Sequence, residues 1–233
     1  MEVSPEASTA ARLRALAALA ALKVLSRAAW GRLRFKGLRV LVPRGCFAPV
    51  FVSTSLLSDT AAALVKEGLV VEVGAGCGSL ALSLARSRGV EVVGTDVDLR
   101  CLKASLANAK LNGLDALYHP VTCAEASCLR GGAFDYALAN PPYLPLDQRF
   151  SLFACGGANL EVYRRILADA ARALREGGLL LFTASTLTGR VKGALLLAER
   201  WAFFDRVRAF AWRKPSESSP SRPRGRCAAG SPA

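Results

Sequence analysis

Residues 69–87, LVVEVGAGCGSLALSLARS, contain three successive patterns that decide the fold. The first, at 69–76, begins with a continuous apolar run rich in valine, which is typical of a strand buried on both faces. Glycines then alternate through EVGAGCG (72–78), where the backbone must turn tightly. The apolar spacing of 79–87 predicts a helix. Together these patterns predict one strand–turn–helix unit of a parallel sheet.

Similar units flank this stretch on both sides. We expect helices at 55–68, 99–113, 161–178 and 189–204, and strands at 90–98, 116–123, 134–140, 179–185 and 206–213. Repeated strand–helix units with right-handed crossovers build an α/β fold with a doubly wound, mostly parallel sheet. Ligands of such sheets bind beyond the carboxyl ends of the strands. The sequence therefore predicts one site where several strand ends meet.

The positive charge of the chain is concentrated at its two ends. The formal net charge is +13; residues 1–40 carry eight basic and two acidic side chains, and 213–233 carry five basic and one acidic. We expect a basic N-terminal helical extension (1–40), a central domain (41–213) and a disordered basic tail (214–233). The helix of the extension, at 8–30, is expected to pack on the body. Such ends can attract RNA, or they can serve solubility alone.

The cysteine pattern, the histidine content and the hydropathy bear on the redox state of the thiols, on zinc binding and on membrane insertion. Seven cysteines lie scattered without a CxxC pair, and His119 is the one histidine. This pattern predicts reduced thiols in a cytoplasmic protein and no intrinsic zinc site, with His119 in a structural role. No apolar run approaches the roughly 18–20 residues that a membrane helix needs, so no membrane partner is expected.

The glycine turn has the spacing ExGxGxG, formed by Glu72, Gly74, Gly76 and Gly78. Ser79 stands where a dinucleotide-binding GxGxxG turn needs its third glycine, so that pattern fails. The turn resembles the first motif of the S-adenosylmethionine-dependent methyltransferases. That resemblance implies S-adenosyl-L-methionine as the cofactor, with Glu72 holding the loop or the cofactor amine.

Acidic residues follow the next two predicted strands. Asp96 lies at a strand end and can accept hydrogen bonds from both hydroxyls of a ribose. Asp98 can do the same, or it can cap the following helix. The methyltransferase resemblance also implies that Glu125, beyond the third strand, lies near the adenine.

The stretch LANPPYLP (138–145) ends another predicted strand. A planar, conjugated NH₂ group is a weak nucleophile, because its lone pair is delocalised. The Asn140 side-chain oxygen and the Pro141 carbonyl can accept its two hydrogens, and proline fixes the backbone angle beforehand. Tyr143 offers a flat face for stacking, and Pro142 completes the rigid corner. We expect these four residues to bind an NH₂ group, with Asn140, Pro141 and Tyr143 catalytic.

Five stretches together resemble one family: ExGxGxG, TDVD, KASLANAKLNG, FDYALANPPYLP and GGANLEVYRRIL. They resemble the HemK/PrmC protein-glutamine N5-methyltransferases, and more narrowly the short archaeal–eukaryotic branch of that family. The resemblance covers residues 50–185 and implies a class I methyltransferase fold acting on the GGQ motif of a translation termination factor. It matches Gly156, Gly157 and Glu161 to a stretch that shapes the substrate side. Many members are stabilised by a small zinc-binding activator protein.

The chain departs from the family pattern at three places. Val52 and Ser53 replace two acids, and the hydroxyl of Ser53 or Thr54 is expected to contact the cofactor instead. Asn159 stands where the family has glycine. The family ends in an antiparallel hairpin, of which only 206–213 is evident. We therefore expect a sheet that is one strand short or a chain end that is unusual.

Other functions suit the same residues. The NPPY corner also suits adenine N6 or guanine N2, although a base must leave its stack to reach it. The intact glycines, Asp96 and Asn140 argue against a non-catalytic RNA-binding module with a vestigial pocket. An aminopropyltransferase would need acidic residues where NPPY stands. We therefore expect a protein-glutamine N-methyltransferase, with nucleic-acid base methylation as the alternative.

Overall fold

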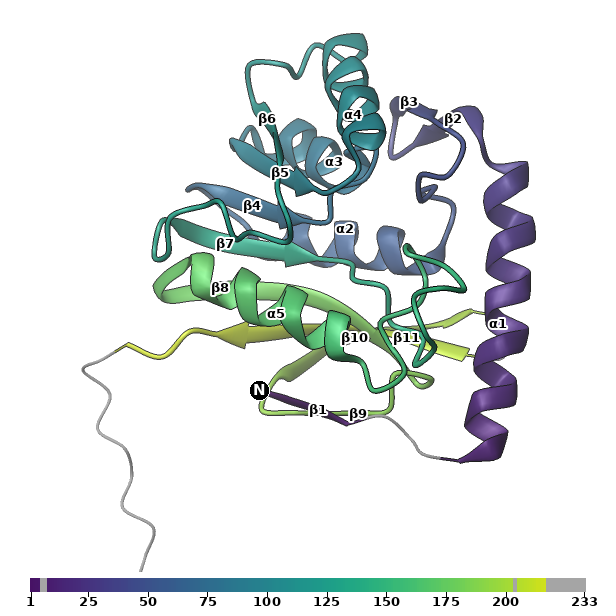
Figure 1. The fold of residues 1–233 in the computed structure, drawn as a ribbon. Coiled ribbons are helices and arrows are strands. Elements are labelled where there is room, and N and C mark those ends of the chain that lie inside the picture. The colour runs from purple at the N-terminus through teal and green to yellow at the C-terminus, as the bar shows by residue number, and fades with distance from the viewer. Residues whose placement is uncertain (5–7, 203–204, 217–233) are drawn as a thin grey trace, which may run out of the picture.

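A seven-stranded sheet forms the centre of the computed structural model, which describes residues 1–4, 8–202 and 205–216. The strands lie in the order β10-β11-β8-β7-β4-β5-β6 (Figure 1). Their bounds are β4 Val70–Val73, β5 Val92–Asp96, β6 Tyr118–Thr122, β7 Phe134–Ala139, β8 Leu174–Ser185, β10 Leu195–Ala202 and β11 Asp205–Arg213. The five strands from β8 to β6 are parallel, whereas β11 runs antiparallel to both β8 and β10. The predicted doubly wound, mostly parallel fold is confirmed.

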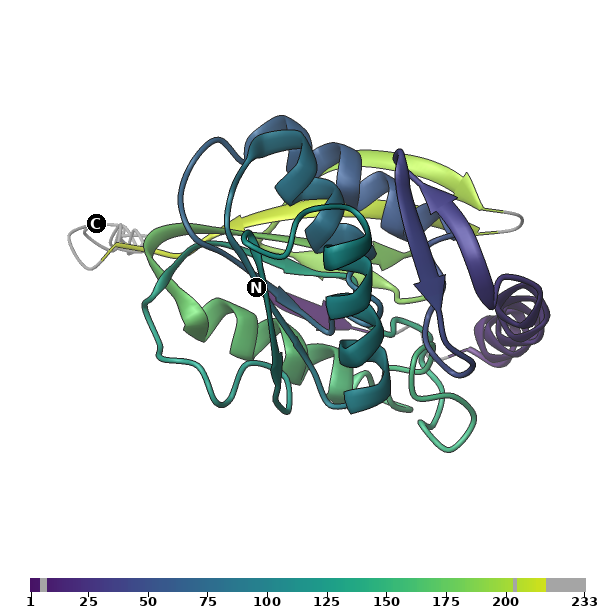
Figure 2. The same ribbon diagram turned by 90° about the horizontal axis from the view of Figure 1, so that it is seen from above.

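Helices cover both faces of this sheet (Figure 2). They are α2 Val52–Leu64, α3 Ser79–Arg88, α4 Leu99–Leu111 and α5 Glu161–Ala173. Because successive strand side chains point to opposite faces, Val70 packs in the cluster with α2, α3 and α4, whereas Val71 packs with α5. Both faces of the sheet are thus buried, which explains why the strand sequences are continuous apolar runs.

The predicted helix at 189–204 is wrong. The described residues of this range, 189–202, include β9 (Arg190–Lys192) and β10, and β10 pairs antiparallel with β11. The missing second strand of the expected hairpin therefore precedes 206–213, and the sheet is not one strand short. Alanine, leucine, glutamate and arginine favour a helix in this segment, but the free edge of β11 satisfies the segment's backbone groups instead.

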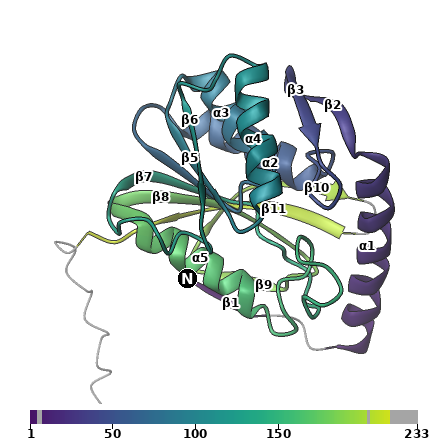
Figure 3. The ribbon, with the colours of Figure 1, turned by 45° about the horizontal axis from the view of Figure 1, so that its top comes forward.

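The N-terminal region packs on the body. Here β1 (Glu2–Ser4) pairs with β9, α1 (Thr9–Ala28) follows, and β2 (Gly31–Phe35) and β3 (Leu38–Val42) form a hairpin. The predicted helix at 8–30 is confirmed, and the expected boundary after residue 40 falls inside β3. Figure 3 shows α1 beside the loop that follows β7.

Two expectations concern the chain end and the membrane. The predicted disordered tail, 214–233, lies outside the described residues from position 217 onward. Lys214 is described, and its backbone N–H donates to the Gly178 carbonyl.

Within the described segments, no helix combines the length and the apolarity required to span a bilayer.

Candidate active site

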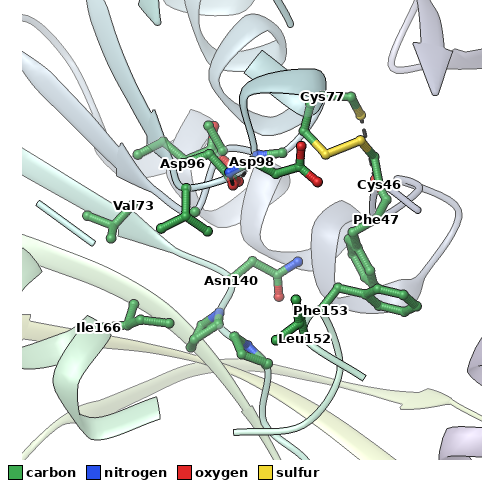
Figure 4. A pocket seen from close by; sticks show the side chains of 18 of the residues that line it. Cys46, Phe47, Val73, Cys77, Asp96, Asp98, Asn140, Leu152, Phe153 and Ile166 are labelled. Carbon is green, nitrogen blue, oxygen red and sulfur yellow. Dashed lines mark hydrogen bonds between the residues drawn. A yellow bond between two sulfur atoms is a disulfide. The ribbon is translucent and has the colours of Figure 1, made fainter. Parts of the chain in front are cut away.

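A cavity of about 340 Å³ opens at the carboxyl ends of β4, β5 and β7. These strands are neighbours in the sheet, so the residues that follow each of them meet in one place. Figure 4 shows Asp96 on one side of the cavity, Phe47 and Phe153 on another, and Asn140 between them. The topology thus brings together the glycine turn, Asp96 and the start of NPPY, as the sequence predicts.

The glycine turn exposes its backbone to this cavity. Gly74 and Gly76 have φ of 78° and 55°, and a Cβ on either would meet no atom within 4 Å. Gly78 differs, because a Cβ there would lie 2.9 Å from the Ser105 Cβ. Gly78 begins α3 and lets that helix approach α4. Gly74 and Gly76 line the cavity and Gly78 does not, so the contact on which Gly78 is seen to depend is the packing of the two helices.

Glu72 holds the turn against the start of α3. Its side chain is buried, and its Oε2 accepts a hydrogen bond from the Ala81 N–H at 2.8 Å. Burial, together with the nearby Asp96 carboxylate, raises the pKa of this carboxyl to about 8. The expected role in holding the loop is therefore the one that the contacts support.

Asp96 is positioned by two backbone N–H groups. Its Oδ2 accepts from Gly76 at 2.8 Å, and its Oδ1 accepts from Asp98 at 2.9 Å. Each oxygen keeps a lone pair that can accept a further hydrogen bond. Asp98 instead caps α4 through the Arg100 N–H and forms an ion pair with the Arg100 side chain. Of the two roles predicted for Asp98, helix capping is the one present.

The Asn140 carboxamide is held from two sides. Its Nδ2 donates to the Thr54 Oγ1 at 3.2 Å, and its Oδ1 accepts from the Thr183 Oγ1 at 2.7 Å. Thr54 belongs to α2 and lines the cavity, and Thr183 belongs to β8 and is fully buried. The hydroxyl of Thr54, which the sequence predicts to contact the cofactor, is thus already an acceptor for Asn140. Sequence reasoning missed Thr183, whose only signal is a hydroxyl within an apolar strand.

The two prolines of NPPY line the cavity, and a glycine pair supports them. A Cβ on Gly156 would lie 2.4 Å from the Pro142 carbonyl oxygen, so only glycine allows this approach. Gly157 has φ of 95° and lies against the Glu161 carboxylate, which accepts from the Asn159 N–H. The stretch matched to the substrate side thus supports the NPPY loop.

Tyr143 is not placed as predicted. Its ring packs against the apolar cluster that joins α1 to the loop after β7, and it is not among the residues lining the cavity. Burial, and secondarily Asp205, raises the pKa of its phenol. The flat walls of the cavity are instead Phe47 and Phe153, whose ring centroids lie 6.1 Å apart. These two residues carry no recognisable sequence signal.

Glu125 lies at the cavity, but its carboxylate is engaged. Its Oε1 accepts from the Arg165 Nε at 2.8 Å, and Arg165, on α5, lines the same cavity. The backbone of Glu125 has φ of 49°, which suits the tight turn after β6. Any ligand group near Glu125 therefore also meets the guanidinium of Arg165.

Two disulfides are present, Cys46–Cys101 and Cys123–Cys128. The prediction of reduced thiols is wrong for these four residues, while Cys227 lies outside the described part of the chain. Cys46 and Cys101 are 55 positions apart, and the fold brings the loop after β3 against the start of α4. No group of histidine, cysteine or acidic residues that could hold a metal occurs among the described residues.

The family follows from a comparison with known proteins. Residues 48–195 match the family model of the methyltransferase small domain. The chain belongs to this methyltransferase family. A solved structure of an Escherichia coli protein assigned as a methyltransferase has the same fold, with a TM-score of 0.57 over 80% of this chain and 100% of that one, at 17% identity.

Curated relatives confirm the resemblance to the HemK/PrmC family. The release factor glutamine methyltransferase of Deinococcus radiodurans is 35% identical over 152 residues, which are 59% of this chain and 52% of that protein. A Methanocaldococcus jannaschii protein assigned as a protein N5-glutamine methyltransferase is 30% identical over 132 residues, 54% of this chain and 66% of that protein. The chain spans about half of the first relative and two thirds of the second.

The raised pKa of Glu72 predicts a specific pH dependence of stability. Between 4.5 and about 8, the folded chain keeps a proton that the unfolded chain has released. Glu72 therefore makes the free energy of unfolding fall as pH rises through this window. In Glu72→Gln, which keeps the acceptor for Ala81, this contribution should vanish. Denaturant unfolding at both ends of the window measures it, and equal pH slopes in both proteins would contradict the burial argument.

Proposed function

We propose that this chain is an S-adenosylmethionine-dependent N-methyltransferase that methylates a planar NH₂ group, namely the side-chain amide of a protein glutamine. One observation carries the proposal: the Asn140 carboxamide lines the same cavity as Asp96 and the glycine turn. The residues proposed to bind the cofactor and those proposed to bind the amide thus line one continuous cavity. The catalytic role of Asn140 and Pro141 rests on this arrangement.

The residues present suit the proposed cofactor. The open backbone of Gly74 and Gly76 leaves room for a ligand at contact distance, and the cavity volume lies in the range of small-molecule sites. Asp96 would hold the ribose, and Glu125 lies where the adenine is expected. S-adenosylmethionine supplies an electrophilic methyl group on a sulfonium, which is a good leaving group.

The protein contributes alignment. The Asn140 oxygen and the Pro141 carbonyl accept the two in-plane hydrogens of the acceptor amide, which directs the nitrogen lone pair at the methyl carbon. Thr183 occupies one lone pair of the Asn140 oxygen and leaves the other for the acceptor. Phe47 and Phe153 cover the flat face of the amide and exclude water. The amide releases its extra proton after transfer, so no general base is required beforehand.

The names of the relatives favour a glutamine acceptor. Several relatives are named release factor glutamine methyltransferases, so a glutamine of a termination factor is the acceptor that we propose. The family resemblance implies the glutamine of the GGQ motif, and a cytoplasmic location stays a prediction. A nucleic-acid base remains the alternative, because the two-acceptor geometry suits adenine N6 or guanine N2 equally. RNA as a partner of the basic ends and a zinc-binding activator subunit also remain predictions.

One assay tests the acceptor. Purified chain is incubated with S-adenosylmethionine labelled in its methyl group and, in parallel, with termination factor, tRNA and ribosomal RNA. We expect label in the termination factor, located by mass spectrometry at its GGQ glutamine and absent when that glutamine is replaced by glutamate. Label in an RNA alone would support the base alternative. Absence of cofactor binding in calorimetry would support a vestigial pocket.

Asn140→Ala should abolish methyl transfer while leaving cofactor affinity within a fewfold. The side chain contacts the acceptor in this mechanism, and its two partners, Thr54 and Thr183, belong to rigid elements. Single-turnover kinetics and calorimetry separate the two effects. If cofactor binding were lost in parallel with activity, the proposed role in holding the acceptor would be wrong.

Asp96→Asn should weaken cofactor binding by about 1.5–3 kcal/mol, roughly 10- to 150-fold, the scale of hydrogen bonds to a charged group. Asp98→Asn is the matched control, because it removes the same charge but keeps the cap of α4. Calorimetric titration with S-adenosylmethionine measures both. Equal losses in the two variants would argue against Asp96 as the ribose ligand.

Thr183→Val should lower kcat about tenfold, which corresponds to a hydrogen bond of about 1.4 kcal/mol. Valine keeps the shape of the buried side chain but removes the donor that orients Asn140. Thr183→Ser keeps the donor and should restore most of the rate. Cofactor affinity should stay constant in both variants. A serine variant as slow as the valine variant would point to packing rather than orientation.

A further inference from the structure

Three arginines line a second hollow, which shares no residue with the lining of the candidate active site. Arg34, Arg39 and Arg86 line a surface hollow of about 700 Å³, together with Gly37, Leu111 and Asn112. Arg34 and Arg39 belong to the β2–β3 hairpin, which lies beside α4 (Figure 1), and Arg86 belongs to α3. No carboxylate lines the hollow. Its wall is therefore strongly positive.

Two of these charges face each other across the hairpin. Arg34 and Arg39 are directly opposite partners in the β2–β3 register, an arrangement of like charges that destabilises a strand pair. The alternation of the strand sends Phe35 into the core and leaves Arg34 exposed. Arg34 and Arg39 thus repel each other at exposed positions, where an uncharged polar side chain would also fit.

The guanidinium groups are fixed by neutral partners. Arg39 Nη2 donates to the Leu111 carbonyl at 2.9 Å, and Arg86 Nη1 donates to the Gly37 carbonyl at 2.7 Å. The Asn112 Oδ1 accepts from the Arg39 backbone N–H at 3.0 Å and holds the strand against the end of α4. Carbonyl oxygens position a guanidinium without neutralising its charge. Two of the three cations are therefore oriented in advance.

Some basic side chains of the described chain are neutralised by a carboxylate partner, unlike the three arginines of the hollow. Lys36, at the turn of the same hairpin, forms an ion pair with Asp59, and Arg165 on α5 pairs with Glu125. None of the ion pairs found among the described residues includes Arg34, Arg39 or Arg86. What sets this cluster apart is that three unpaired guanidinium groups line one hollow that has no carboxylate in its lining.

We propose that this arginine hollow, Arg34–Arg39–Arg86, binds the phosphate backbone of an RNA strand. Guanidinium groups bind phosphate oxygens in a bidentate manner, and three of them can contact successive phosphates. The exposed Arg32, two positions before Arg34 on β2, lies on the same face of the strand and extends the positive surface. The exposed large apolar side chains of the described residues lie outside the hairpin, which disfavours a membrane surface. The inference holds whichever group accepts the methyl.

The test compares two triple variants of the full chain. Arg34→Gln/Arg39→Gln/Arg86→Gln removes the hollow's charge, and Arg130→Gln/Arg190→Gln/Lys192→Gln removes the same charge at exposed positions elsewhere. Fluorescence anisotropy with a short labelled single-stranded RNA, at several salt concentrations, gives the affinity and its salt slope. Methyl transfer and melting temperature are measured alongside, since neither set of residues lines the candidate active site.

The hollow variant should bind RNA at least tenfold more weakly than the wild type, and the control should stay within threefold. The slope of log affinity against log salt should fall by about 2, since each of three phosphate contacts contributes about 0.7 on a single strand. Its melting temperature should change little, because removal of the like-charge pair offsets the loss of the hydrogen bonds from Arg39 and Arg86 to backbone carbonyls. Equal losses in both triple variants, or no RNA binding by the wild type at low salt, would overturn the proposal. If the triple variant does not fold, each single variant should still weaken binding, and no weakening in any of them would likewise overturn it.

Discussion

The candidate site depends on the hydrogen bonds that hold Asn140 between α2 and β8. Thr183 fixes the carboxamide oxygen, and Thr54 accepts from the carboxamide nitrogen, so the side chain cannot rotate without losing both partners. A reaction whose barrier is lowered mainly by alignment needs this constraint before the acceptor arrives. Asn140 and Pro141 supply the polar groups that would bind the acceptor. Much of the remaining cavity wall can therefore be apolar, as Phe47 and Phe153 are.

The region outside the sheet supports the same corner. α1 packs through Ala15 and Leu19 on Leu144 and Cys155, which follow the NPPY sequence. Gly156 lets the chain return within contact distance of the Pro142 carbonyl. The N-terminal helix, which the sequence predicts to pack on the body, therefore stabilises the loop that forms the acceptor side. Tyr143 is part of this support and not a wall of the cavity.

The sequence predicted the parts of the fold that local patterns encode. Alternating apolar strands and helices from 55 to 185, the glycine turn and Asp96 were all placed correctly relative to one another. The segment 189–204 was mispredicted because its helical composition is overridden by pairing with β11. Thr183, Phe47 and the partner of Cys46 could not be predicted, because each acts through contacts with residues distant in the chain. The choice between the two predicted roles of Glu72, and the packing role of Gly78, required knowledge of which atoms surround them.

The most direct test of the proposed amide-binding role of Asn140 and Pro141 is a crystal structure with S-adenosylhomocysteine and a peptide that contains the proposed glutamine acceptor. We expect the glutamine amide nitrogen within about 3 Å of both the Asn140 side-chain oxygen and the Pro141 carbonyl. The cofactor product should lie over Gly74 and Gly76, with its ribose on Asp96. A peptide amide bound elsewhere, with Asn140 bonded to Thr54 and Thr183 alone, would contradict it.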